Sequence, residues 1–258
     1  MSMTILDQQI ETAAALIRQA RYAVAMTGAG ISTPSGIPDF RSPHSGLWRD
    51  VDPMTVASIF SFQQNPQYFY DWIRPLSGVM VSARPNAAHQ ALAALEQAGR
   101  LKAVITQNID DLHGKAGSKT VYELHGHLRE VTCMQCHQVE EAALIVDQFI
   151  SDGQVPRHHC GGVLKPNVIL FGEQLPVREY LAAEQAVKAA DLILAVGSSL
   201  EVAPASDLPA LAVANGAKVI IINYEPTHLD PEATLIIRAD VAEALPRIAE
   251  LVVTAAAR

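Results

Sequence analysis

The chain has 258 residues, of which 49% are hydrophobic and 18% charged, and its 19 basic and 27 acidic side chains give a formal net charge of −8. This apolar content excludes an intrinsically disordered chain and is enough for a large core. The acidic balance, with no long run of Lys or Arg, argues against a protein that holds a nucleic-acid backbone by charge.

The sequence shows neither a membrane segment nor an export signal. Its apolar runs are short, as at 192–196 and 219–222, whereas a membrane helix needs roughly 20 residues. Residues 1–19 lack a basic region followed by an apolar stretch and a small-residue cleavage site. We therefore expect a cytoplasmic protein with no membrane partner.

Strands and helices alternate along most of the chain. An amphipathic helix is predicted over 5–17, followed by a buried strand over 22–27 that stops at a glycine-rich turn. The later predicted elements are strands at 102–106, 192–196 and 218–222, separated by helices at 86–98, 177–189 and 204–215. This order predicts an α/β fold with a doubly wound, mostly parallel, Rossmann-like sheet.

Two stretches interrupt the alternation and are predicted to form a smaller inserted lobe. The first, 41–84, contains predicted helices at 53–61 and 66–79, and the second, 126–166, carries all three cysteines. Neither stretch shows a clean buried strand. The predicted main domain therefore combines the remaining segments, 1–40, 85–125 and 167–258.

Small and polar residues follow three of the predicted strands. Gly28, Ala29, Gly30 and Ser32 could let a phosphate approach the backbone, although an ordinary strand-to-loop turn is as good an explanation of this turn alone. Similar turns occur at 197–199 and at 223–225, where an amide and a carboxylate could contact ribose hydroxyls. Three such turns at one edge of a parallel sheet favour a dinucleotide ligand.

An ordered set of motifs spans residues 28–241. The motifs are Gly28-Ala29-Gly30-Ile31-Ser32, Gly36-Ile37-Pro38-Asp39-Phe40-Arg41, Thr106-Gln107-Asn108-Ile109-Asp110, Leu124-His125-Gly126, Cys133-x-x-Cys136, Pro166-Asn167-Val168, Phe171-Gly172-Glu173 and Gly197-Ser198-Ser199. In this order they resemble the motifs of the sirtuins, the Sir2-type NAD-dependent protein lysine deacylases with a single catalytic core.

The resemblance implies a cofactor site and a substrate site. The implied NAD contacts are Gly28, Ala29, Gly30, Ser32, Asp39, Phe40, Arg41, Gln107, Asn108, Ile109, Asp110, Gly197, Ser198, Ser199, Asn223, Glu225 and Val241. The implied substrate contacts are Val168, Phe171, Gly172 and Glu173, where an extended peptide could add as a strand. A buried strand over 168–171 is the plain alternative, and Asp110 could simply cap a following helix.

The implied reaction consumes NAD as a co-substrate. The acyl oxygen of an acyl-lysine displaces nicotinamide from C1′ of the ribose, and a ribose hydroxyl then attacks the acyl carbon. Water completes the release of free lysine and 2′-O-acyl-ADP-ribose. His125 is the implied base and Asn108 the second catalytic residue, while the neighbouring His127 has no implied role. Without this resemblance, a lone histidine would more often be a structural imidazole.

The implied partners are proteins or peptides that contain acetyl-lysine, bound by a monomer that has no direct nucleic-acid ligand. One alternative function is a mono-ADP-ribosyltransferase, which keeps NAD and changes the acceptor. Another is a non-catalytic binding module that senses NAD. The motif set containing Asn108, Asp110 and His125 favours deacetylation over both.

The cysteines predict one structural zinc ion per chain. Because three cysteines cannot all pair, and Cys133 and Cys136 have metal-ligand spacing, a disulfide is set aside. The resemblance implies a second cysteine pair, but only Cys160 is present there. His158 is the preferred fourth ligand over His159, and loss of the metal is the alternative.

The preferred acyl group depends on a Tyr-x-x-Arg pair that marks family members acting on acidic acyl chains. Here Tyr70 is followed three positions later by Ile73, and Arg74 comes one position late. One position turns a helical side chain by about 100°, so Arg74 should miss the pocket. We expect acetyl, with longer neutral chains tolerated, although plain helix packing explains Tyr70, Trp72 and Ile73 equally well.

Overall fold

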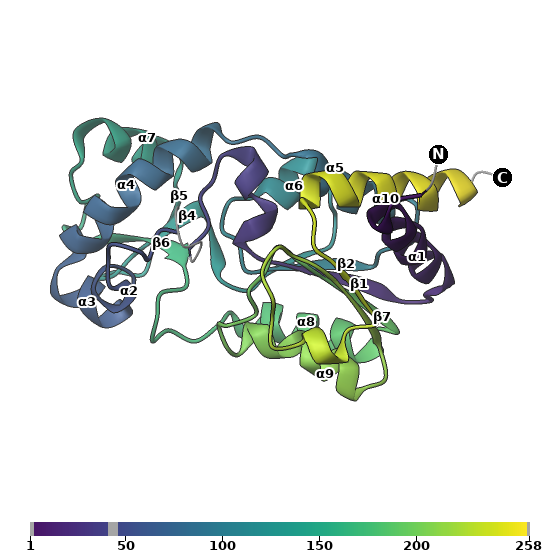
Figure 1. Cartoon of the computed structure of the whole chain (residues 1–258). Helices are drawn as coiled ribbons and strands as arrows, with labels where there is room; N and C mark the ends of the chain where they lie inside the picture. Colours follow the sequence, from purple (N-terminus) through teal and green to yellow (C-terminus); the bar gives the residue numbers. More distant parts are fainter. Residues whose placement is uncertain (1–2, 41–45, 257–258) are drawn as a thin grey trace.

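The structure is a computed structural model that describes residues 3–40 and 46–256. A six-stranded sheet lies between two layers of helices, and a second group of helices and strands lies on the left of the molecule (Figure 1). Within the described residues, no helix has both the length and the apolar content needed to cross a membrane.

Six parallel strands form the larger sheet in the order β3-β2-β1-β7-β8-β9. Their bounds are β1 Ala23–Thr27, β2 Ala103–Thr106, β3 Val121–Glu123, β7 Leu192–Val196, β8 Lys218–Ile222 and β9 Leu235–Ile237. The chain order reverses between β1 and β7. Ligands of open α/β sheets bind beyond the carboxyl ends of the strands at such a reversal.

Helices cover both faces of this sheet, which confirms the doubly wound fold. One face packs against α1 Ile5–Gln19, α5 Ala87–Gln97 and α10 Val241–Ala256, and the other against α8 Val177–Ala189 and α9 Leu208–Ala214. Alternate strand residues point to opposite layers. In β1, Ala25 belongs to the first core and Met26 to the second.

The smaller part contains helices beside an antiparallel sheet of order β5-β4-β6 (Figure 1). Its elements are α2 Pro53–Val56, α3 Ile59–Gln64, α4 Pro66–Ser82, β4 Gly126–Cys133, β5 Val139–Glu141, α7 Ala143–Asp152 and β6 Leu164–Val168. The remaining short helices are α6 Leu112–Ala116, η1 Ala29–Ile31, η2 Thr33–Ser35, η3 Ala205–Asp207 and η4 Asp230–Glu232.

Two local expectations were wrong. The helix predicted over 53–61 is two helices, because Ser58 interrupts it and caps α3 by accepting a hydrogen bond from the Ser61 N–H. The strand considered over 168–171 ends at Val168, and Phe171 forms an isolated bridge with Ser58. The stretch 126–166 contains β4 and β5, which are partly exposed and therefore show no clean buried strand in the sequence, and the largely buried β6 begins near its end.

Candidate functional site

The turn after β1 packs directly against the turn after β7. The N–H of Gly30 donates to the carbonyl of Gly197 at 2.8 Å. A Cβ added at Gly28 would lie 2.8 Å from the Gly197 oxygen, and one added at Gly30 would lie 2.9 Å from the Gly197 Cα. Both glycines are therefore required by the contact between the two turns, in addition to any approach to a ligand.

A buried polar cluster lies behind these turns. The Ser32 hydroxyl donates to Asp110 Oδ2 at 2.6 Å, and the Asn108 amide donates to Ser32 Oγ and to the Gly28 carbonyl, both at 3.1 Å. Burial raises the pKa of Asp110, against the lowering effect of the Ser32 hydrogen bond. Asp110 also accepts from the Leu112 N–H at the start of α6. The helix-capping and cofactor interpretations of Asp110 are thus compatible.

Two histidines that the sequence analysis did not single out extend this cluster. His89 on α5 lies 3.5 Å from Ser32 Oγ, and His113 on α6 lies 2.9 Å from Thr27 Oγ1, with ring centroids 4.8 Å apart. Burial lowers the pKa of His89 to about 4 and that of His113 to about 3. Both imidazoles are consequently neutral beneath the cavity at neutral pH.

These two histidines predict a stability that falls in mild acid. The unfolded chain binds protons at its histidines near pH 6.5, whereas the folded chain does so only near pH 4 and 3. Between these limits the unfolded state holds more protons, so the free energy of unfolding decreases by about 1.4 kcal/mol per pH unit per histidine as the pH falls. Urea unfolding from pH 7 to 5 measures this slope.

Single substitutions test whether these histidines cause the pH dependence of the free energy of unfolding. His89→Gln should remove about half of it, because one neutral buried imidazole is lost. His228→Gln, at an exposed position, should leave the slope unchanged. An equal slope in His89→Gln and the wild type would contradict the assignment.

His125 lies between β3 and β4 and faces the same cavity. Its Nδ1 lies 3.0 Å from the Gln107 carbonyl, which can only accept, so Nδ1 carries the hydrogen and a neutral ring has its lone pair on Nε2. Gly126 has a φ of +74°, and a Cβ there would lie 2.0 Å from the Asn167 carbonyl oxygen. The Leu124-His125-Gly126 motif thus reflects a turn that only glycine fits.

The segment after β6 is held in place by hydrogen bonds of its own. The Ile169 N–H donates to the His125 carbonyl at 2.8 Å. Glu173 accepts from the Leu170 N–H at 2.8 Å and pairs with the buried Lys165 ammonium at 3.0 Å. The Glu173 carboxylate therefore braces this segment from within, although the residue also lines the cavity.

Aromatic side chains stack along one wall of the cavity. Phe40 stacks on Trp48 with ring centroids 5.0 Å apart, and Trp48 stacks on Trp72 at 5.1 Å. The N–H groups of Leu47 and Trp48 donate to the carbonyls of Asp39 and Phe40, each at 3.0 Å, which holds Trp48 beside Phe40. The expected contact Arg41 lies outside the described residues.

One cavity of about 1200 Å³ joins all these features. Apart from Arg41, every expected NAD and substrate residue lines it, together with His125. Asn223 and Glu225 line it after β8, and Val241 lines it at the start of α10. Within the described chain, the buried amide nitrogen of Gln107 has no hydrogen-bond partner, as expected where a polar ligand binds. These residues fit a dinucleotide.

An apolar face of α4 lines another part of the cavity, through Phe69, Trp72, Ile73, Leu76 and Met80. Tyr70 and Arg74 turn elsewhere. The Tyr70 hydroxyl donates to the Leu164 carbonyl, and the Arg74 guanidinium donates to the carbonyls of Ile150 and Ser151. Neither side chain is placed to recognise an acidic acyl group, as the position of Arg74 in the sequence predicted.

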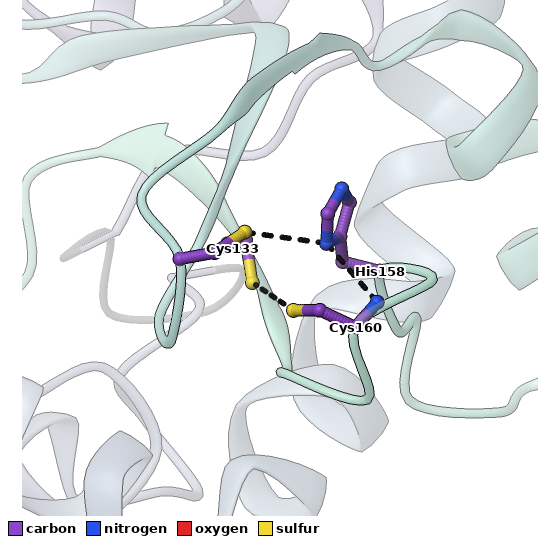
Figure 2. A group of neighbouring side chains, drawn as sticks. Cys133, His158 and Cys160 are labelled. Atoms are coloured by element: carbon purple, nitrogen blue, oxygen red, sulfur yellow. Dashed lines mark hydrogen bonds between the residues drawn. The ribbon is translucent and has the colours of Figure 1, made fainter.

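Three thiols and one imidazole meet at the end of the small antiparallel sheet. The ligand atoms of Cys133, Cys136, His158 and Cys160 all lie within 4.8 Å of one another. Figure 2 shows Cys133, His158 and Cys160 pointing toward one another, with the two sulfurs 3.5 Å apart. A hydrogen bond from the Cys136 N–H lowers the pKa of the Cys133 thiol to about 7. This Cys₃His set fits one tetrahedral zinc ion.

Known proteins are similar to this chain over most of its length. The sequence profile of the Sir2 family matches residues 28–204. The chain belongs to the Sir2 family. It is 45% identical to NAD-dependent protein deacylase 2 of Archaeoglobus fulgidus, over 95% of this chain and 96% of that protein. It is 44% identical to the NAD-dependent protein deacetylase of Sulfurisphaera tokodaii, over 92% and 93%.

A solved Sir2 structure also resembles this Sir2-family chain closely. It contains a deacetylated p53 peptide and 3′-O-acetyl-ADP-ribose. The two structures align with a TM-score of 0.89 at 40% identity, covering 94% of this chain and 98% of the other. The expected family and fold are therefore confirmed.

Proposed function

We propose that this Sir2-family protein is an NAD-dependent protein lysine deacetylase, which converts NAD, an acetyl-lysine and water into nicotinamide, lysine and 2′-O-acetyl-ADP-ribose. The observation that carries the proposal is the single cavity that contains the strand-end turns, His125 and the apolar face of α4. A dinucleotide at the strand ends and a neutral acyl-lysine beside α4 would both reach His125 in this cavity. The names of the relatives support the same activity.

The polar residues at the strand ends are proposed to hold NAD. The turns at Gly28–Gly30 and Gly197–Ser199 would face the phosphates with Arg41, and Asn223, Glu225 and Val241 would face the adenosine. Gln107, Asn108, Ile109 and Asp110 would contact the nicotinamide ribose, with Asp39 and Phe40 covering it. The aromatic wall of Phe40, Trp48 and Trp72 would exclude water, which otherwise competes for the sugar carbon.

His125 is proposed as the general base. A bound NAD supplies a positively charged leaving group, so the protein has mainly to align the acyl oxygen with the sugar carbon and keep water away. The hydrogen bond to Gln107 fixes the imidazole tautomer with its lone pair on Nε2, which can take the proton of a ribose hydroxyl. Asn108 would help orient that ribose.

The segment from Val168 to Glu173 is proposed to receive the peptide. Phe171 and Gly172 line the cavity, and Lys165 and Glu173 hold the segment in place. The zinc ion is proposed to be structural, because the four donors lie at the end of the small sheet and none of them lines the cavity. The division into a main domain and an inserted lobe likewise remains our proposal, as do the monomeric state, a cytoplasmic location and the absence of a nucleic-acid ligand.

The test is to incubate the full chain with NAD and an acetyl-lysine peptide and to measure products by mass spectrometry. The proposal predicts that the peptide loses its acetyl group as nicotinamide and O-acetyl-ADP-ribose appear in equal amounts. A peptide that gains ADP-ribose would support the transferase alternative. NAD binding without turnover would support the sensing module.

A panel of acyl groups tests the substrate pocket in the same assay. Acetyl and longer neutral acyl-lysines should react, because the face of α4 that lines the cavity is apolar. A succinyl-lysine should react poorly, since Arg74 is bound to the carbonyls of Ile150 and Ser151 and an unpaired carboxylate is costly to bury. A preference for succinyl would contradict this view of the pocket.

A further inference from the structure

The proposed fourth metal donor of this chain is a histidine. Its ring must be oriented toward the metal in one tautomer, a requirement that a cysteine does not have. A thiolate offers one charged sulfur, whereas a neutral imidazole must direct a specific nitrogen, in a specific tautomer, at the metal. His158 is almost fully buried, with 1% of its side chain exposed. The orientation of its ring must therefore come from neighbouring groups.

Contacts on both sides of the ring determine this orientation. Nδ1 of His158 faces the thiols, 3.3 Å from Cys136 Sγ, and also lies 3.3 Å from the Cys160 N–H. A backbone N–H can only donate, so Nδ1 presents its lone pair and Nε2 carries the hydrogen. Nε2 is buried without a hydrogen-bond partner in the described structure, and Oε1 of Glu140 lies 3.2 Å from it, close enough to accept that hydrogen once the two groups are aligned.

The strand pairing places the Glu140 side chain on the metal side of the small sheet. Glu140 on β5 pairs with Val131 on β4, and paired residues project to the same face. Val131 packs in the same cluster as Cys133, two residues along β4. The adjacent Glu141 pairs with Glu130, so it projects to the opposite face and is exposed.

We propose that Glu140 is the positioning residue of the metal centre: its carboxylate accepts from Nε2 of His158 and fixes the tautomer in which Nδ1 is offered to zinc. Glu140 thereby supports a histidine at the position where the family resemblance implies a cysteine. Metal-bound histidines commonly use such carboxylate partners, and their loss weakens metal binding about 10- to 100-fold. The inference rests on the proposed zinc centre and is independent of the deacetylase activity.

The test is the zinc affinity of the full chain, measured by competition with a chromophoric chelator. Glu140→Gln keeps the size and one oxygen but loses the charge, so it should weaken binding by about 10-fold, and Glu140→Ala should approach about 100-fold. Glu141→Gln, on the other face of the same strand, should bind zinc like the wild type. Equal affinities of Glu140→Gln and Glu141→Gln would overturn the proposal.

The variant His158→Cys separates positioning of His158 by Glu140 from a general effect of charge or stability on zinc affinity. In His158→Cys the sulfur needs no orienting partner, so adding Glu140→Gln should leave its zinc affinity unchanged. If Glu140→Gln weakened zinc binding as much in His158→Cys as it does in the chain that retains His158, the proposal would be overturned. His159→Ala should also bind zinc normally.

The number of zinc ions bound per chain distinguishes positioning by Glu140 from direct ligation by Glu140. It also tests the zinc centre separately from the deacetylase activity. The oxygen of Glu140 and the ring nitrogens of His158 and His159 also lie within 4.8 Å of one another. A second zinc ion that is lost in Glu140→Gln would show that Glu140 is itself a ligand and would overturn the proposal. A wild-type chain without zinc would overturn the zinc centre and this inference together, while leaving the deacetylase proposal standing.

Discussion

Replacement of His125 by alanine is expected to lower the turnover number for an acetyl-lysine peptide by about 10² to 10⁴, the usual contribution of a positioned general base. The imidazole is held by the Gln107 carbonyl and faces the cavity with its Nε2 lone pair available in the neutral ring. Its removal leaves the strand-end turns unchanged, so NAD binding should persist. Steady-state kinetics with both substrates, together with NAD titration, measure the two effects separately.

His127→Ala is the matched control, because it removes the same ring two residues further along the chain. His127 does not line the cavity, and its Nε2 lies 3.9 Å from Glu130. Its turnover should remain close to that of the wild type. Equal activities of the two variants would refute the role of His125 as base.

Removal of zinc is expected to unfold the small antiparallel sheet while the six-stranded sheet stays folded. In Cys133→Ser the hydroxyl is a poor zinc ligand, and it lies in an apolar cluster with Val131 and Leu164. Zinc binding by small structural sites contributes about 10–16 kcal/mol at neutral pH. This exceeds what so small a hydrophobic cluster supplies by burial, at about 1.5–3 kcal/mol per large side chain.

Hydrogen exchange resolved along the chain measures whether the small sheet unfolds while the six-stranded sheet stays folded. Amides of β4, β5, β6 and α7 should lose their protection in Cys133→Ser or in chelator, while those of β1, β2 and β7 keep theirs. His159→Ala, beside the proposed ligand His158, should retain the wild-type pattern. Full protection of β4 to β6 in Cys133→Ser would contradict a structural metal. Activity should also fall, because β4 begins at Gly126, next to His125.

The buried strands were predictable from sequence because each carries a continuous apolar run. The strands β1, β2 and β7 are buried at every residue. The two edge strands, β3 and β9, were not predicted. They have three residues each and are largely half-buried, so their sequences show neither a long apolar run nor a clear alternation.

The polar turns of the cavity were predictable because they follow strand ends, which a parallel sheet brings to one edge, whereas Asp39, Phe40 and the substrate residues were expected only from the resemblance to sirtuins. Their supporting partners were not. His113 contacts Thr27 across 86 positions of the chain, and Glu140 reaches His158 from another strand. Trp48 similarly stacks on both Phe40 and Trp72, which are not its neighbours in the sequence. No local pattern encodes such contacts, since they depend on the arrangement of distant elements.

The path of the amide oxygen tests the proposed chemistry most directly. An acetyl-lysine peptide labelled with a heavy isotope in its amide carbonyl is incubated with NAD and the enzyme, and the products are fragmented in a mass spectrometer. If the acyl oxygen displaces nicotinamide, the heavy atom is found on C1′ of the ribose and the acetyl group carries none of it. Heavy oxygen retained in the acetyl group would mean direct hydrolysis of the amide and would contradict the account.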